Sequence, residues 1–284
     1  IDLVLLLEET GRAGLAEPVI STAAVGVPLL RGVGSKKLAD RWLGAVAAGE
    51  ALLAVGQSGS PFVSDAHVAN LLLLSHGDEI HAVPAGDASL THQPSNDPSE
   101  RIFSVAWEPG PATLAARGEE ARRLQAAALD RGALGCAAQA LGVTQRLVEM
   151  TVEYACQRKQ FGKPIGSFQA IKHMLANVQV RLEYARTVVY RAAHSVARNS
   201  EQRAVDVSMA KSAACETAQN AAKVALQVYG ALGYTWEQDL HIWMRRAWSL
   251  EAAWGDGAWH RARVAEAILD SDAAAGTFGY SAPV

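Results

Sequence analysis

The sequence predicts an α-rich fold of the α+β class, with a partial helical N-terminal segment, a reduced middle β domain and a C-terminal four-helix bundle. Three observations predict it. Alanine-rich helical runs fill residues 118–270, helical periodicity fails between residues 51 and 114, and helix spacing returns before residue 52. The 284 residues, half of them hydrophobic, suffice for one large core or two smaller ones. The expected domains are residues 1–50, 51–116 and 117–272, followed by a frayed tail at 273–284.

The N-terminal segment is expected to contain two helices. Leu3, Leu6 and Leu7 recur at helix spacing, Gly14 is a stop signal, and Ser35 is placed to cap the second helix. The segment begins in the middle of a helical pattern. We therefore expect further residues before it and treat this domain as incomplete.

The middle region is expected to form a small β domain. Its short apolar runs are separated by Gly, Pro, Ser, Asn and Asp, which is the pattern of strands joined by turns. The polar stretch at residues 92–98 is expected to be a loop. The expected strands are residues 52–55, 71–74, 80–83 and 102–107.

The C-terminal half is expected to be a bundle of four helices, at residues 119–157, 169–197, 204–228 and 239–269. In the second helix the apolar residues step alternately by four and three, which is a heptad seam that packs on neighbouring helices. The third helix is rich in small residues and is expected to approach its neighbours closely. The seam consists of Ile171, Leu175, Val178, Leu182, Ala185, Val189, Ala192 and Val196, and the small residues are Ala213, Ala214, Ala218, Ala221 and Ala222.

Composition narrows the possible partners. The chain has 26 basic and 29 acidic side chains and no basic block, which argues against nucleic acid or anionic membrane as its main partner. The apolar run from Leu3 to Leu7 is too short to span a bilayer, and we expect a cytoplasmic protein. Cys136, Cys156 and Cys215 show no metal-ligand spacing. We expect them to be buried, unpaired small side chains and expect no metal site.

Residues 158–165, with the sequence RKQFGKPI, interrupt the predicted bundle between its first two helices. Gly and Pro enforce a turn there. Any helix corner can carry a charged turn, which accounts for Lys159 and Lys163. It does not account for Arg158 and Gln160 followed by the aromatic Phe161. An exposed guanidinium beside the donors of a turn is suited to a pyrophosphate.

Residues 227–234, with the sequence QVYGALGY, form a helix end followed by a glycine-rich turn. Glycines allow backbone N–H groups to approach a ligand closely, but they also cap helices. On its own this segment favours the capping role over a cofactor site.

Together the two segments resemble the acyl-CoA dehydrogenase family, whose C-terminal bundle carries an R-x-Q-F-G-x-P-I turn and, one helix later, a Q-x-x-G-G-x-G-Y turn. The resemblance covers residues 118–270 and implies a bundle of that family's type. In the family these turns reach the pyrophosphate and ADP portion of an FAD held mainly by the other subunit of a dimer. The resemblance thus implies FAD contacts from Arg158, Gln160, Phe161, Gln227 and Gly230, with Ala231 in place of the second glycine.

The catalytic base of that family is a Glu beside the flavin, where its position and pKa can be tuned. Counting from the second turn places the usual base position at Trp254, and an indole has no basic lone pair. The alternative position on the first bundle helix falls on Gly132. We therefore expect no catalytic residue in this chain, with Asp256 retained as the candidate for a shifted base and His260 ranked behind it.

Other acids nearby, Asp130 and Glu251, are of a kind that more often caps helices or faces solvent. The β region departs from the family too. Residues 55–62 read VGQSGSPF where relatives carry a T-E-P-x-x-G-S-D loop, and no Thr or Trp pair is evident to hold the isoalloxazine. The Gly, Gln and Ser of this stretch do not form a hydrolase nucleophile elbow, because the second glycine is out of register.

The retained residues are those that a subunit donates to its partner's FAD, and the missing ones are those of its own active site. This pattern resembles the degenerate subunit of actinobacterial heteromeric acyl-CoA dehydrogenases, which assemble as α2β2 tetramers and act on CoA thioesters of steroid side chains. The resemblance implies a catalytic partner subunit that binds most of the acyl-CoA substrate. Two alternatives stay open: an FAD-free scaffold homodimer, and an autonomous dehydrogenase using Asp256.

Overall fold

The computed structural model describes residues 1–269, so the predicted tail and the last residues of the predicted bundle, 270–272, lie outside the described part. The chain divides into two compact units. The bundle unit joins Ile1–Arg12 to the chain from Cys136 onward, and the β unit is Ala13–Gly135. These limits follow packing, and the predicted domain boundaries remain a prediction. The α-rich fold class is confirmed.

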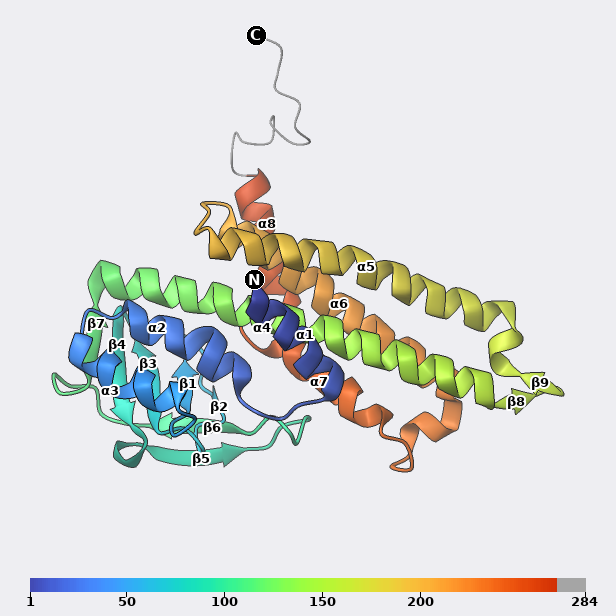
Figure 1. The fold of residues 1–284 in the computed structure, drawn as a ribbon, viewed down its shortest axis with the longest axis horizontal. Coiled ribbons are helices and arrows are strands. Elements are labelled where there is room, and N and C mark those ends of the chain that lie inside the picture. The colour runs from blue at the N-terminus through green and yellow to red at the C-terminus, as the bar shows by residue number, and fades with distance from the viewer. Residues whose placement is uncertain (270–284) are drawn as a thin grey trace, which may run out of the picture. The chain divides into compact units, whose positions relative to one another are not determined.

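The β unit contains two small sheets, three short helical segments before them, the 3-10 turn η2 (Ala85–Asp87) and the first part of α4 (Figure 1). The first sheet has the order β1-β3-β4-β7, with β1 parallel to β3 and the other pairs antiparallel. The second has the order β2-β6-β5 and is antiparallel. The strands are β1 (Leu53–Gly56), β2 (Val63–Ser64), β3 (Leu71–His76), β4 (Glu79–Pro84), β5 (Ser89–Gln93), β6 (Ile102–Ala106) and β7 (Leu114–Arg117), and the helical segments before them are the π-helix η1 (Ile20–Gly26), α2 (Val27–Gly32) and α3 (Lys36–Ala47).

Strand β3 forms the centre of the β unit's core. Its four consecutive leucines, residues 71–74, are all buried, as expected of a strand covered on both faces. On one face Leu72 and Leu74 pack with Phe103 of the second sheet. Strand β1 pairs with β3 and also contacts η1, because the hydroxyl of Thr22 in η1 donates to the carbonyl of Leu53 in β1 at 2.9 Å.

In the first half of the chain the predicted stop and cap are confirmed, but the prediction of two N-terminal helices is wrong, because η1 and α2 lie between α1 and α3. Gly14 follows α1 (Asp2–Ala13) with a left-handed φ of 67°, and the hydroxyl of Ser35 accepts from the amide of Leu38 at the start of α3. The predicted loop at 92–98 is wrong for its first two residues. His92 and Gln93 end β5, because they pair with β6.

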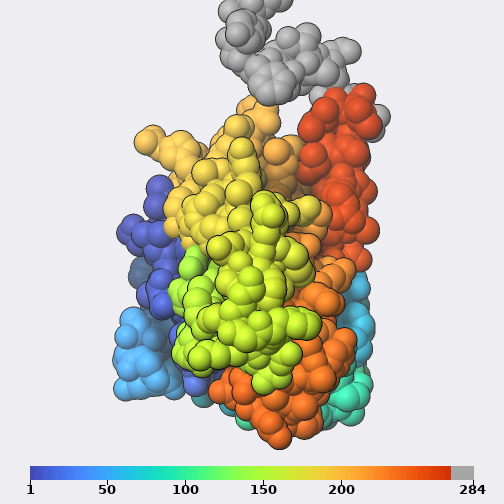
Figure 2. All heavy atoms as spheres, turned by 90° about the vertical axis from the view of Figure 1, so that its right-hand side faces the viewer, coloured from blue at the N-terminus to red at the C-terminus, as the bar shows by residue number. Residues whose placement is uncertain are grey.

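The bundle unit contains the second half of α4 (Gly118–Gln157) together with α5 (Gln169–Ala197) and α6 (Arg203–Tyr229), and α5 and α6 run side by side (Figure 1). Its short elements are β8 (Lys159–Gln160), β9 (Lys163–Pro164) and the 3-10 turns η3 (Ile165–Ser167) and η4 (Gly230–Tyr234). Figure 2 shows the end of this unit, with the β8–β9 hairpin in yellow-green and the orange segment around η4 next to it.

The predicted packing seam of α5 is buried over its central part, from Val178 to Ala192, while its first two residues and its last are partly exposed. Helix α6 buries most of its small residues against α5, α7 and α8. Two of the three cysteines are buried as predicted. Cys156 is exposed, which corrects the prediction, because it lies on the solvent face of the last turn of α4, whereas its neighbour Ala155 is buried.

The predicted fourth helix is wrong as a single element. It is two helices, α7 (Leu240–Ala252) and α8 (Gly257–Leu269), separated by a break at residues 253–256. Trp254 and Gly255 have φ values of 59° and 89°, in the left-handed region that no right-handed helix can continue through.

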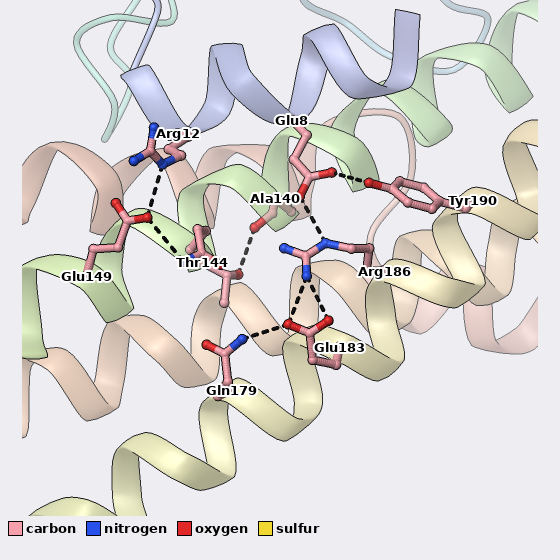
Figure 3. Close-up of polar contacts among 10 residues, drawn as sticks. Glu8, Arg12, Ala140, Thr144, Glu149, Gln179, Glu183, Arg186 and Tyr190 are labelled. Atoms are coloured by element: carbon pink, nitrogen blue, oxygen red, sulfur yellow. Dashed lines mark hydrogen bonds and ion pairs between the residues drawn. The ribbon is translucent and has the colours of Figure 1, made fainter. Parts of the chain in front are cut away.

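Helix α1 packs on α4 with almost no side chain between them. A Cβ added to Gly142 would lie 1.8 Å from the carbonyl oxygen of Glu8, and one added to Gly11 would lie 2.1 Å from the carbonyl oxygen of Gln139. Polar contacts flank this crossing (Figure 3). Glu8 accepts from Arg186 of α5 at 3.1 Å and from the hydroxyl of Tyr190 at 2.8 Å.

Two properties of residues 1–269 bear on the functional classes considered above. No helix in this range has the length and apolar character needed to cross a membrane. Within the same range, no cluster of three or more His, Cys, Asp and Glu side chains is arranged to bind a metal ion.

Candidate functional site

The turn between α4 and α5 is a small β-hairpin. Strands β8 and β9 pair Lys159 with Pro164 and Gln160 with Lys163, which leaves two residues at the tip. These are Phe161 and Gly162, with φ of 51° and 78°. Positive φ at both central residues defines the type I′ turn that two-residue hairpins prefer. Gly162 is therefore favoured at this position by the positive φ that the turn requires, and the hairpin fixes the path of the backbone around Phe161.

The predicted ligand-binding side chains of this hairpin all point to solvent. Arg158 and Gln160 are exposed, and Phe161 is 91% exposed, an unusual position for so large an apolar side chain. The backbone beneath them is closed, because the amide of Ile165 donates to the carbonyl of Arg158 at 2.8 Å. The guanidinium is thus held on a fixed backbone with its donors facing outward.

The second motif ends α6 and turns into η4. Gly230 has φ of 62° and ψ of −139°, a combination that is essentially restricted to glycine, and its amide donates to the carbonyl of Leu226. The capping role expected for this glycine is therefore present. A Cβ on Gly230 would meet nothing within 4 Å, so the space beside it is open. Gln227 and Ala231 are exposed on either side of the turn.

A pair of tyrosines brings the two motifs together. The rings of Tyr154, one helical turn before Arg158, and Tyr229, directly before Gly230, stack with centroids 4.1 Å apart and an interplanar angle of 10°. The hydroxyl of Tyr229 donates to the carbonyl of Met150 at 3.1 Å. Burial, followed by the nearby charge of a glutamate, raises the pKa of Tyr229, so this hydroxyl stays protonated and continues to donate. Both turns therefore lie at one end of the bundle.

This end of the bundle has the chemistry of an anion-binding surface. Arg158, Lys159 and Lys163 are exposed on the hairpin, and the ammonium of Lys163 lies 4.5 Å from the centroid of the Phe168 ring. A guanidinium can donate two parallel hydrogen bonds to a phosphate, and the open side of Gly230 admits a ligand close to the backbone. The residues present fit the pyrophosphate portion of a dinucleotide such as FAD.

The positions where a base was sought contain none. Trp254 lies in the left-handed break between α7 and α8, and Gly132 is buried within α4 of the β unit. Asp256 is exposed, and its carboxylate accepts from the amide of Trp259 at 2.7 Å. That is the contact of a helix N-cap, and it explains the residue without catalysis.

The remaining candidates also have structural partners. The Glu251 carboxylate accepts from the amide of Gly257 at 2.9 Å and so contacts the start of α8. His260 is fully buried, with its two ring nitrogens 3.0 Å from the Ser208 hydroxyl and 3.0 Å from the carbonyl of Trp254. Asp130 is buried in α4.

Sequence reasoning missed two features of this unit. The stacked tyrosines were not singled out, although Tyr154 stands one helical turn before Arg158. The second is Lys211 of α6, which is fully buried and donates to the carbonyls of Glu251 and Gly255 at 2.8 and 2.9 Å. Lys211 stands among the alanines of α6, and a lysine that is fully buried almost always has hydrogen-bond partners.

Comparisons with known proteins identify the relatives of this architecture. The family described as acyl-CoA dehydrogenase, C-terminal domain, matches residues 122–269. The acyl-CoA dehydrogenase IpdE2 of Mycobacterium tuberculosis is 29% identical over 252 residues, which cover 87% of this chain and 71% of the relative.

Solved structures share the fold. The ChsE4-ChsE5 complex from Mycobacterium tuberculosis matches with a TM-score of 0.83 and 24% identity, covering 94% of this chain and 80% of the other. The Tcur3481-Tcur3483 steroid ACAD matches with a TM-score of 0.83 and 22% identity, covering 94% and 80%.

Proposed function

This chain belongs to the acyl-CoA dehydrogenase family, oxidoreductases that act on CH–CH bonds with FAD, and on that premise we propose that it is the non-catalytic subunit of a heteromeric member. In this proposal a catalytic partner subunit supplies the base, the contacts to the flavin ring and most of the acyl-CoA pocket. The present chain supplies contacts to the pyrophosphate and ADP portion. Two chains of each kind form an α2β2 assembly.

One contrast carries the proposal. The hairpin with Arg158 and the turn at Gly230 are exposed, whereas Trp254 stands where the base of relatives is expected. A chain that used these turns for its own active site would need a base as well. Donor groups without a base are what a subunit needs if it completes a site on another chain.

The chemistry within this chain is binding and orientation. Arg158 would hold the pyrophosphate, Gln160 and Gln227 would donate to neighbouring oxygens, and Phe161 would cover the ligand with its exposed ring. Gly230 leaves room for the ligand, and Ala231 adds one methyl group at that edge. When bound, FAD supplies the acceptor for the hydride removed from the acyl chain.

We further propose that the acyl group is a steroid side chain. The support is the match to a structure described as a steroid ACAD and to a complex of two named chains. The test is turnover of CoA thioesters by the purified assembly, comparing steroid side chains with short straight chains. Higher kcat/KM for the straight chains would refute this part alone.

The decisive experiment for the subunit role is purification of the chain with the partner that it retains, followed by measurement of FAD content. Arg158→Ala should weaken FAD binding roughly ten- to a hundredfold, because removal of a charge-assisted hydrogen bond costs about 1.5–3 kcal/mol. Arg198→Ala is the control, since Arg198 is an exposed arginine at the end of α5, outside both turns.

Two other outcomes would replace the proposal. Unchanged flavin content in Arg158→Ala would favour the FAD-free scaffold homodimer. A homomer that binds one FAD per chain and oxidises acyl-CoA alone would favour the autonomous dehydrogenase. The latter also requires Asp256→Asn to abolish turnover, which is not expected of a residue that caps α8.

A further inference from the structure

The break between α7 and α8, residues 253–256, is built as a separate piece of structure. Its two central residues are left-handed, and one of them is the bulky Trp254 rather than glycine. A left-handed residue of this kind costs about 1–2 kcal/mol and persists where surrounding contacts impose it. Gly255 has no room for a side chain, because a Cβ would lie 2.8 Å from the Trp259 ring and 2.9 Å from His260 Nε2.

Helix α6 supplies the main contacts that impose this backbone. The ammonium of Lys211 is withdrawn completely from solvent and donates to the carbonyl of Glu251 at 2.8 Å and to that of Gly255 at 2.9 Å. These two carbonyls lie on opposite sides of Trp254. One side chain therefore fixes both ends of the break, and the contact is charge-assisted on both sides.

Further contacts come from α8 and from the break itself. The carbonyl of Trp254 accepts from His260 Nε2 at 3.0 Å, which in the neutral ring leaves Nδ1 to accept from the Ser208 hydroxyl at 3.0 Å. The Asp256 carboxylate caps α8 from within the break. The hydrogen bond to residue 254 goes through its backbone carbonyl, and the bonds from Lys211 go to the carbonyls on either side, so these contacts do not depend on the indole.

We propose that Lys211 is a positioning residue that sets the break from α6, so that residue 254 is held in one orientation whatever side chain it carries. This inference rests on the proposed function, which places the base position of relatives at Trp254. It adds that residue 254 lacks a base only because of its side chain. The backbone contacts that would orient a carboxylate at this position are present.

Hydrogen exchange of the break tests this in the purified chain. Trp254→Glu should leave exchange of peptides spanning residues 252–259 within about twofold of wild type, because the backbone contacts are unchanged. Lys211→Met should accelerate exchange there by about tenfold or more, since two buried carbonyls lose their donor. Lys223→Met, an exposed lysine three turns further along α6, is the matched control and should change nothing.

The same measurement can overturn the proposal. If Trp254→Glu accelerates exchange as much as Lys211→Met, the indole itself holds the break. If Lys211→Met accelerates exchange equally in α5 and α6, the lysine stabilises the whole bundle and has no positioning role. Lys211→Arg should restore slow exchange, and failure of this rescue would also count against the proposal. Where Lys211→Met does not fold, His260→Gln replaces it with the same expectation for the carbonyl of Trp254.

These readouts need neither FAD nor a partner. Loss of the subunit role through the Arg158→Ala experiment would leave the exchange result standing, and the reverse also holds. The two failures are therefore distinguishable.

Discussion

Replacing Gly142 with alanine is expected to push α1 off α4. The new Cβ would lie 1.8 Å from the carbonyl oxygen of Glu8 and 2.5 Å from the amide nitrogen of Arg12, and neither backbone atom can rotate away. Ordinary contact begins near 3.4 Å, so the two helices would have to separate by about 1.6 Å. That movement loosens Leu7 and Val4, the apolar side chains of α1 that are buried.

The magnitude follows from burial. Complete burial of one aliphatic side chain is worth about 1.5–3 kcal/mol, and overpacking typically costs about 1–3 kcal/mol. Alanine gains about 1 kcal/mol over glycine as a helix former, which offsets part of the loss. The net expectation for Gly142→Ala is a destabilisation of about 2–4 kcal/mol, most of it in the contact of α1.

Urea unfolding followed by far-ultraviolet circular dichroism, with hydrogen exchange of the α1 amides, measures both parts. Gly44→Ala in α3 is the control, because a Cβ there meets nothing within 4 Å. It should stabilise the chain by about 0.5–1 kcal/mol. Stability of Gly142→Ala equal to that of wild type, with slow α1 exchange, would refute the close crossing of the two helices.

Three further predictions concern the polar contacts. The pKa of Glu149 lies below its usual range, because burial would raise it but hydrogen bonds from Arg12 and Gln145 outweigh burial. The contribution of Glu149 to the stability of the folded chain is therefore complete above about pH 4.5 and is lost as the pH falls through the lower pKa of the folded state. Glu149→Gln should therefore flatten the acid limb of a stability-against-pH curve. Asp256→Ala should destabilise α8 by about 1 kcal/mol while Asp256→Asn does not, as read from thermal unfolding, because only an N-cap acceptor is lost. Gly162→Val should lower FAD affinity of the assembly without shifting Tm of the chain, because its φ of 78° disfavours a branched residue only at the hairpin tip.

Features that depend on neighbouring residues could be predicted from the sequence. The stop at Gly14 and the cap at Ser35 are set within one turn of chain, and both are found. The same holds for the two motif turns, whose residue types determine their backbone. The apolar seam of α5 was also predictable, because heptad spacing places those residues on one face.

Features that depend on distant residues could not be predicted. The break at Trp254 is held by Lys211, which lies more than forty residues earlier in the sequence. The spacing of apolar residues around Trp254 therefore still predicts one continuous helix. From the sequence alone Gly142 is only a weak helix former. The reason for a glycine at this position is the close approach of α1, which belongs to the N-terminal end of the chain. The exposure of Cys156 depends on which face of α4 is covered by other segments, which the sequence of α4 alone does not encode.

The hairpin tip has a practical consequence for handling this protein. Arg158 and Lys159 are consecutive, exposed cleavage sites for trypsin, while the bond after Lys163 is protected by Pro164. A protease can reach the first two only while that face is bare. Brief digestion with trypsin should therefore cut the chain at this hairpin when the hairpin is exposed. Loss of this cut in the presence of cofactor or partner would show that one of them covers this end of the bundle.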